Sequence, residues 1–200
     1  MFCVIGLGNP ENRYSETRHN LGFEVVDHLA SRLGLRFQEG KGEFLVARGT
    51  MRDMQLVLAK PVTYMNNSGV AVVEICEQYE VPLEQLLVVC DDFQLPLGQL
   101  RLRLRGSDGG HNGLYSVIYH LQSDLFPRLR CGIASPAMPK EKDRLADFVL
   151  ERFTEDELPA VRQMIGRASD ACFLALERGL TAAMNEFNKK VEAEDDSPNP

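Results

Sequence analysis

The sequence lacks the patterns that membrane and exported proteins require. No apolar run approaches the roughly 20 residues that a membrane-spanning helix needs. The N-terminus has no basic region followed by an apolar stretch and a cleavage site, so it does not resemble a signal peptide. The chain also has no internal repeat. These absences predict a cytoplasmic protein that does not use a membrane as a partner.

The sequence also lacks paired cysteines. Its five cysteines are far apart, and none belongs to a C-x-x-C motif of the kind found in redox and zinc sites. Most have apolar neighbours, which is typical of buried thiols in a reducing compartment. We therefore expect buried thiols at Cys3, Cys76, Cys90, Cys131 and Cys172.

Three common catalytic motifs are absent as well. There is no G-x-S-x-G turn for a serine nucleophile, no H-E-x-x-H pair for zinc and no phosphate-binding P-loop. Gly6-Leu7-Gly8 is similar to the start of a dinucleotide-binding fingerprint, but Glu11 replaces its third glycine and Pro10 interrupts the turn. A nucleotide-dependent oxidoreductase is thus disfavoured, and the absorbance of a bound dinucleotide would test for one.

Length and composition fit one domain with one sizeable core. The chain has 200 residues, of which 44% are hydrophobic and 26% are charged, values typical of a soluble globular protein. We expect residues 1–191 to form this single domain. Residues 192–200 are acidic and have nothing to bury, so we expect a disordered tail there.

The charge is unevenly distributed along the chain. A net charge of −7 argues at first against a nucleic-acid partner, because phosphates attract Lys and Arg. Four of the acidic residues, however, lie between positions 192 and 196. Between positions 101 and 130, five arginines face only Asp108 and Asp124. A locally basic face on a mildly acidic protein is compatible with binding a few phosphates.

Apolar periodicity predicts strands that alternate with helices. Strands are expected at residues 2–5, 44–48, 54–60, 86–90, 100–105 and 129–134, with the second and third around Gly49. Helices are expected at residues 22–33, 70–79, 114–121, 158–175 and 181–190. This alternation predicts an α/β protein: a single-domain, three-layer fold with a mostly parallel, twisted mixed sheet flanked by helices.

A histidine before the first predicted helix is a candidate for catalysis. It lies in Thr17-Arg18-His19-Asn20, and an imidazole has an ordinary pKa of about 6.5, so His19 can act as a general base near neutral pH. The alternative is a capping or surface histidine. His28 and His120 lie inside predicted helices and are interpreted as structural.

Two acidic residues end the strongest predicted strand. Asp91 and Asp92 come directly after residues 86–90, at the kind of strand end where active-site residues of α/β sheets often lie. A carboxylate beside an imidazole fixes its tautomer and raises its strength as a base. The alternative is a loop aspartate that caps backbone amides, and the pattern itself does not choose between Asp91 and Asp92.

Two further segments carry amide side chains near predicted helix starts. Asn66, in Met65-Asn66-Asn67-Ser68-Gly69, can donate to a carbonyl oxygen as negative charge develops on it, although turn asparagines are common. In Gly109-Gly110-His111-Asn112-Gly113 the glycines allow close approach of a ligand, and His111 and Asn112 project from the helix start. A plain helix cap at Asn112 is the alternative.

An alternating segment places arginines on one side of a strand. Leu and Arg alternate from residue 100 to residue 105, and a period of two puts Arg101, Arg103 and Arg105 on one face. The leucines then face the other side. This pattern predicts a basic surface.

Together these segments resemble one known family in order and spacing. The matching motifs are Gly6-Leu7-Gly8-Asn9-Pro10, Tyr14 with Thr17-Arg18-His19-Asn20, Lys60-Pro61 with Tyr64-Met65-Asn66, Asp91 with Leu95-Pro96-Leu97-Gly98, and Gly109-Gly110-His111-Asn112-Gly113. They are similar to those of bacterial peptidyl-tRNA hydrolases, over roughly residues 1–190. The resemblance is specific, because five separate motifs would have to coincide.

The resemblance implies a role for each matching residue. His19 is similar to the family's catalytic base, Asp91 to its partner carboxylate, and Asn66 to the residue that positions the reacting centre. Asn9 and Asn112, with Asn66, resemble the asparagines that bind the peptide backbone and the terminal adenosine. The remaining residues implied in substrate binding are Tyr14, Met65 and His111 in the cleft, and Arg103 and Arg130 as a clamp on the 5′-phosphate of tRNA.

The implied activity is hydrolysis of the ester bond between peptide and tRNA, which recycles the tRNA. His19, polarised by Asp91, would take a proton from water, and Asn66 would stabilise the oxyanion. An ester has an alcohol leaving group, so no metal or other cofactor is implied. We expect peptidyl-tRNA as the substrate, tRNA phosphates bound by a basic patch, and a monomer.

Two segments depart from the family pattern. Ala134-Ser135-Pro136 stands where relatives often carry glycine and a basic residue or histidine, and Asp108 puts a negative charge into the glycine-rich loop.

The alternative function is that of a non-catalytic relative, which binds RNA as a splicing or assembly cofactor.

Overall fold

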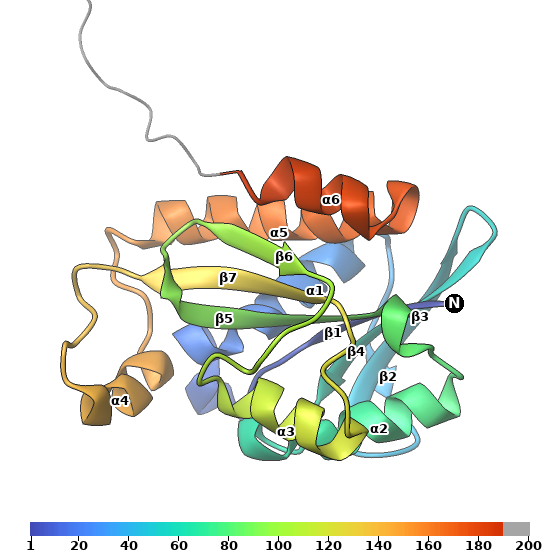
Figure 1. The fold of residues 1–200 in the computed structure, drawn as a ribbon, viewed down its shortest axis with the longest axis horizontal. Helices are drawn as coiled ribbons and strands as arrows, with labels where there is room; N and C mark the ends of the chain where they lie inside the picture. Colours follow the sequence, from blue (N-terminus) through green and yellow to red (C-terminus); the bar gives the residue numbers. More distant parts are fainter. Residues whose placement is uncertain (190–200) are drawn as a thin grey trace, which may run out of the picture.

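One seven-stranded sheet divides the protein into two layers of helices. This arrangement comes from a computed structural model that describes residues 1–189 (Figure 1). The acidic tail expected at residues 192–200 lies outside the described residues. None of the helices within residues 1–189 combines the length and apolarity that crossing a lipid bilayer requires.

The centre of the sheet is parallel and its edges are antiparallel. The strand order is β2-β3-β4-β1-β5-β7-β6. The parallel strands are β1 (Phe2–Gly6), β4 (Met54–Pro61), β5 (Leu86–Pro96) and β7 (Arg128–Ala134). The antiparallel strands are β2 (Gln38–Glu39), β3 (Phe44–Met51) and β6 (Leu100–Arg103). The predicted α/β class and mostly parallel mixed sheet are confirmed.

Helices cover both faces of this sheet. On one face lie α1 (Leu21–Arg32), α5 (Leu158–Arg178) and α6 (Leu180–Phe187), and on the other lie α2 (Ser68–Gln78) and α3 (Asn112–Leu121) (Figure 1). A short helix, α4 (Leu145–Leu150), lies beside one end of the sheet. Two single-turn helices, η2 (Arg18–Asn20) and η3 (Met65–Asn67), precede α1 and α2.

Strand alternation explains why there are two separate cores. In β1, Val4 packs in the core under α1 and α5, whereas Cys3 and Ile5 pack in the core under α2 and α3. Successive side chains of a strand point to opposite faces, so a central strand covered on both sides must be apolar throughout. All five residues of β1 are buried.

Two expectations at strand ends are wrong in detail. Gly49 does not separate two strands; it lies inside β3 opposite Leu56. Leu35 fills the space where a side chain would stand, so a glycine fits at this position. The hairpin turns instead at Arg52, which has a φ of 47°. β6 ends at Arg103, before the alternation does, and this leaves Leu104 46% exposed.

Asp91 and Asp92 do not end their strand. Both are inside β5, where they pair with Cys131 and Gly132 of β7 before an irregularity shifts the register. Pairing with a neighbouring strand satisfies the backbone whatever the side chain is, so polar residues can extend a buried strand when their side chains find partners.

Two glycines bring the start of α1 directly onto the sheet. A Cβ atom on Gly6 would lie 2.1 Å from the carbonyl oxygen of Gly22, and one on Gly22 would lie 2.5 Å from Val89 O. Backbones this close leave no room for side chains. η2, which directly precedes α1, therefore lies against the loop that follows β1 and the middle of β5.

Candidate active site

Polar side chains from three elements of the fold meet above the sheet. His19 comes from η2, Asp91 from β5 and His111 from the position that caps the N-terminus of α3. Loops that follow the carboxyl ends of parallel strands meet at one edge of the sheet, which is where α/β proteins bind ligands. The structure thus brings together residues that are up to 92 positions apart.

Both histidines bind the same oxygen atom of Asp91. His19 Nδ1 lies 2.9 Å and His111 Nε2 lies 3.1 Å from Asp91 Oδ1. The exposed fractions are 8% for His19, 1% for Asp91 and 5% for His111. A buried carboxylate needs such partners, because burial of an uncompensated charge is costly.

The hydrogen bonds assign different tautomers to the two rings. His111 Nδ1 accepts a bond from the backbone N–H of Leu114 at 3.1 Å, so its proton is on Nε2, which donates to Asp91. His19 donates from Nδ1, which leaves a lone pair on its Nε2. Only His19 is therefore arranged as a base.

The same contacts shift the pKa values of His19 and Asp91. Burial by itself would lower the pKa of His19, but the charge of Asp91 and its hydrogen bond outweigh burial and raise that pKa above 6.5. For Asp91, burial acts to raise the pKa, and the charges and hydrogen bonds of the two histidines lower it overall. Asp91 is thus ionised at neutral pH, and it makes His19 a stronger base.

These three residues are also of types that bind transition metals. One possible ligand atom of each lies within 4.8 Å of the others. Both histidines, however, direct a nitrogen at one Asp91 oxygen at hydrogen-bond distance, whereas a zinc ion would stand about 2.0–2.2 Å from each ligand atom. The arrangement fits a hydrogen-bonded group better than it fits a metal centre.

Two adjoining hollows surround this group. One has a volume of about 480 Å³ and is lined by His19, Asp91 and His111, and the other has a volume of about 370 Å³. They share the lining residues His19, Asn112, Ala146 and Val149. The second hollow brings in most of the other predicted site residues: Asn9, Tyr14, Met65 and Asn66.

A pair of asparagines fixes the loop after β1. The backbone of Asn9 exchanges two hydrogen bonds with the side chain of Asn20, at 2.8 and 2.9 Å. Asn9 Oδ1 in turn accepts a bond from Met65 N at 2.9 Å. The amide nitrogen of Asn9 is therefore the end of the side chain that remains for a ligand carbonyl.

Asn66 follows a residue with an unusual backbone. Tyr64 has a φ of 61°, which is rare for a non-glycine residue, and its hydroxyl bonds to Glu11. Met65, which comes next, is buried, and Asn66 is exposed on the wall of the second hollow. Strain of this kind persists where the surroundings hold it, and it commonly marks functional sites.

The sequence matches one known protein family over nearly its whole length. A sequence model of the family described as peptidyl-tRNA hydrolase matches residues 3–195. The chain belongs to the peptidyl-tRNA hydrolase family. The peptidyl-tRNA hydrolase of Chloroflexus aurantiacus is 49% identical over 189 residues, which are 94% of this chain and 99% of the relative. That of Lachnoclostridium phytofermentans is 44% identical over 95% of this chain and 98% of the relative.

Solved structures of the same family have the same fold. The crystal structure of peptidyl-tRNA hydrolase from Acinetobacter baumannii matches with a TM-score of 0.88 and 33% identity, over 94% of each chain. A second crystal structure, of a peptidyl-tRNA hydrolase in complex with N-propanol, has a TM-score of 0.89 and 33% identity over 96% of this chain and 97% of that one. These relatives are named as hydrolases, so the non-catalytic alternative is not favoured.

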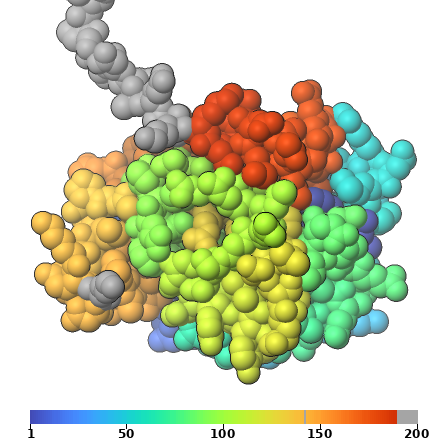
Figure 2. Space-filling model, viewed as in Figure 1, coloured from blue at the N-terminus to red at the C-terminus, as the bar shows by residue number. Residues whose placement is uncertain are grey.

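A third hollow, of about 260 Å³, contains the arginines that the sequence singled out. Figure 2 shows a depression bordered by β6 and the loop that follows it, with β7 at its floor. Its arginines are Arg101, Arg103, Arg105, Arg128 and Arg130. Gln94 and Gly109 line both this hollow and the one beside His19, and the Gln94 side chain donates to Gly109 O at 2.8 Å. The arginine hollow and the hollow beside His19 therefore share a wall in this peptidyl-tRNA hydrolase family member.

Two of these arginines already bond to other groups of the protein. Arg130 donates to Asp92 Oδ2 at 3.0 Å and to Ser107 O at 2.7 Å. Arg128 is buried and donates to several backbone carbonyls, among them Gly106 O and Asp124 O. Burial, followed by the charge of Arg130, lowers the pKa of Arg128 to about 10. Arg128 thus holds the loop, whereas Arg101, Arg103 and Arg105 are exposed.

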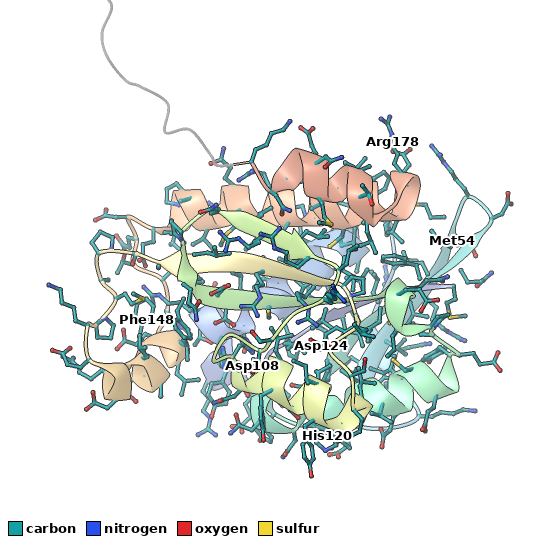
Figure 3. The ribbon with its side chains drawn as sticks, in the orientation of Figure 1. Met54, Asp108, His120, Asp124, Phe148 and Arg178 are labelled. Atoms are coloured by element: carbon teal, nitrogen blue, oxygen red, sulfur yellow. The ribbon has the colours of Figure 1, made fainter. Side chains whose placement is uncertain are left out.

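Asp108, a departure from the family pattern, has a structural role in the same loop (Figure 3). Its carboxylate accepts a bond from Gly110 N at 2.8 Å, and its carbonyl accepts one from His111 N at 3.2 Å. Short polar side chains stabilise turns in this way. The negative charge of Asp108 therefore helps to hold the turn that leads to His111.

Several residues of the site were not predicted from the sequence. They are Asn20, Phe93, Gln94 and the α4 residues Leu145, Ala146 and Val149. Asn20 had a visible signal, because it directly follows His19 in the motif. α4 had none, because six residues are too few to show helical periodicity.

Proposed function

We propose that this protein hydrolyses the ester that joins a peptide to the terminal ribose of tRNA. The observation that carries the proposal is the buried carboxylate of Asp91, which accepts a hydrogen bond from His19 Nδ1 at 2.9 Å beside hollows lined with amide side chains. Membership of the peptidyl-tRNA hydrolase family supports the same substrate.

His19 is the general base of this reaction. Its Nε2 takes a proton from water, and the water oxygen attacks the carbonyl carbon of the ester. Asn66 donates its amide N–H to the oxyanion that forms. When the carbon–oxygen bond to the ribose breaks, the protonated ring of His19 returns the proton to the ribose oxygen. The products are a free peptide acid and tRNA.

The remaining side chains bind the two halves of the substrate. Asn9 and Asn112 contact main-chain groups of the peptide and the terminal adenosine, while Tyr14, Met65 and His111 complete the cleft. Contacts with main-chain groups accept any peptide sequence, and phosphate contacts do not read bases. The enzyme is therefore general in both parts of its substrate.

The tRNA phosphates bind at Arg103 and Arg130. Arg103 is exposed in the arginine hollow, so its guanidinium is directly accessible to a phosphate. Arg130 is paired with Asp92, and a phosphate must compete with that carboxylate for the guanidinium. Together the two form a basic patch whose affinity depends on salt. We also propose a cytoplasmic monomer, and sedimentation of the purified protein tests its oligomeric state.

Release of the amino acid from an N-acetyl-aminoacyl-tRNA tests the activity. Wild-type protein should release it, and His19→Ala should abolish turnover while tRNA affinity stays nearly unchanged. His28→Ala is the matched control, because His28 is an exposed histidine on the adjoining helix α1. tRNA binding by wild-type protein without release would instead support a non-catalytic RNA-binding role.

A further inference from the structure

One wall of the substrate hollows comes from a segment with little structure of its own. Residues 135–157 connect β7 to α5 and contain only the six-residue helix α4 and a preceding single turn. From α4, Ala146 and Val149 line both hollows that contain His19. A helix this short is not stable by itself, so its position depends on tertiary contacts.

The main contact is Arg18, the residue directly before His19. Its guanidinium is 1% exposed and donates to Glu157 Oε2 at 2.6 Å, to Glu151 O at 3.3 Å and to Arg152 O. It also lies 4.3 Å from the ring centre of Phe148 on α4 and 4.9 Å from that of Phe153. Phe148, labelled in Figure 3, is itself buried. One side chain thus holds the far end of the segment by charge, hydrogen bonds and ring contacts.

Glu157 joins the two ends of the segment. Its carboxylate accepts a bond from the hydroxyl of Ser135, directly after β7, and one from Thr154 N at 2.8 Å, just before α5. The backbone N–H of Arg18 adds a bond to Glu151 O at 3.0 Å, and Thr17 forms a bridge with Arg152. The start of the segment, its end and η2 therefore meet at one buried ion pair.

A role in stability alone accounts poorly for such a pair. Replacing buried ion pairs by apolar residues is often neutral or stabilising, so burying one is not an efficient way to stabilise a fold. What a buried arginine does supply, when its planar guanidinium donates to a carboxylate and to backbone carbonyls, is fixed geometry. Here the geometry that it fixes is that of α4 relative to the backbone of His19.

We propose that Arg18 and Glu157 are positioning residues for ester hydrolysis: their ion pair holds α4 as the apolar wall that grips the peptide part of the substrate. This role rests on the proposed function. The pair does not touch the reacting atoms, and it acts through Ala146 and Val149. Its loss weakens the binding of ground state and transition state equally, which raises KM and leaves kcat and its pH dependence unchanged.

Glu157→Gln is the direct test, because it keeps the shape of the side chain and removes its charge. We expect KM for N-acetyl-aminoacyl-tRNA to rise about tenfold, with kcat within about twofold of wild type and an unchanged pH midpoint. Arg18→Lys should act in the same direction, since lysine keeps the charge but loses the planar contacts. Asp170→Asn is the matched control: it breaks the exposed Arg32–Asp170 pair, also on α5, and should leave KM unchanged.

Limited trypsin digestion gives a second readout, independent of activity. Lys140 and Arg144 are exposed in the segment, and Glu157→Gln should speed cleavage there, but Asp170→Asn should not. Val149→Ala should raise KM without faster cleavage, because it alters the wall and leaves the ion pair intact. Ser135→Ala, which removes one bond to Glu157, should give a smaller effect than Glu157→Gln.

The results separate this proposal from the proposed function. If Glu157→Gln lowers the melting temperature but leaves KM and the cleavage rate at wild-type values, the pair is only structural and the proposal is wrong. A lower kcat with a shifted pH midpoint and an unchanged KM would mean that Arg18 acts through His19, which also overturns it. If wild-type protein shows no hydrolysis, the proposed function fails, and faster digestion of Glu157→Gln still decides whether the pair holds α4.

Discussion

His19 and His111 share one oxygen atom of Asp91, and their ring centres are 4.8 Å apart. Two histidines in the same hollow would be interchangeable candidates for the base if only distance mattered. The backbone N–H of Leu114 makes them different, because it occupies Nδ1 of His111 and fixes that ring as a donor to Asp91. His111 is therefore held as a donor to the carboxylate, and in the mechanism that we propose it is His19 that takes up the proton.

This difference predicts unequal effects of removing the two rings. His111→Asn can still cap α3 but does not reach Asp91, and we expect kcat/KM to fall about tenfold to a hundredfold, the range for losing a hydrogen bond to a charged group. His19→Ala should abolish turnover. Steady-state kinetics on the same ester substrate compares them, and complete loss with His111→Asn would place His111 in the proton transfer.

The raised pKa of His19 predicts how activity depends on pH. A base works when deprotonated, so kcat/KM should rise with pH and level off above a midpoint higher than 6.5. Asp91→Asn removes the charge that raises this pKa and leaves burial, which lowers it, so the midpoint should move down while the maximal rate falls. A pH–rate profile of both proteins measures this, and an unmoved midpoint would remove Asp91 as the partner of the base.

The His19–Asp91 pair also affects the stability of the fold. Its contribution to stability falls as the pH rises, whereas activity is expected to increase. A group whose pKa is raised on folding stabilises the folded state when protonated, so His19 contributes fully below its unfolded pKa of about 6.5. This contribution disappears as the pH rises through the higher folded pKa. Denaturant unfolding of wild type and His19→Gln should therefore differ most at low pH, and a difference that grew with pH would contradict the assignment.

The arginine hollow predicts opposite effects for two substitutions. Arg103→Ala should weaken tRNA binding and reduce the slope of log affinity against log salt by about one. Asp92→Asn removes the competitor for Arg130 and should tighten binding at low salt. Arg52→Ala is the control, because Arg52 is exposed at the β3–β4 turn. Filter binding of uncharged tRNA at several salt concentrations measures all three, and an unchanged slope for Arg103→Ala would exclude a phosphate contact there.

Close backbone packing under the site predicts a large loss of stability from one methyl group. A Cβ on Gly22 would lie 2.5 Å from Leu7 N and Val89 O, so Gly22→Ala should destabilise the fold by about 2–4 kcal/mol. Gly166→Ala is the matched control in α5, where a Cβ meets nothing within 4 Å. It should stabilise the protein by about 0.5–1 kcal/mol, because alanine is the better helix former. Urea unfolding compares the two, and equal effects would contradict the packing.

Local patterns in the sequence predicted most of the sheet and the main polar groups, because both depend on residues close together in the chain. The apolar strands β1 and β5 need only their own periodicity, and His19 was prominent because it lies in a short motif. α4 could not be predicted, since what holds it is Arg18, more than 120 positions away. Arg128 counted as surface charge in the sequence, yet its guanidinium is buried among carbonyl groups that folding brings to it. Whether a charged side chain is exposed depends on such distant partners.

The wall formed by Gln94 and Gly109 has a consequence for how this enzyme can change over evolutionary time. Any substitution that moves the wall alters the arginine hollow and the catalytic hollow together, because the two residues border both. With tRNA bound at the arginines as we propose, variants there change tRNA affinity and cleavage rate together. Under the same proposal, substitutions at the exposed arginines of β6 can change tRNA affinity alone, because these arginines line only the arginine hollow.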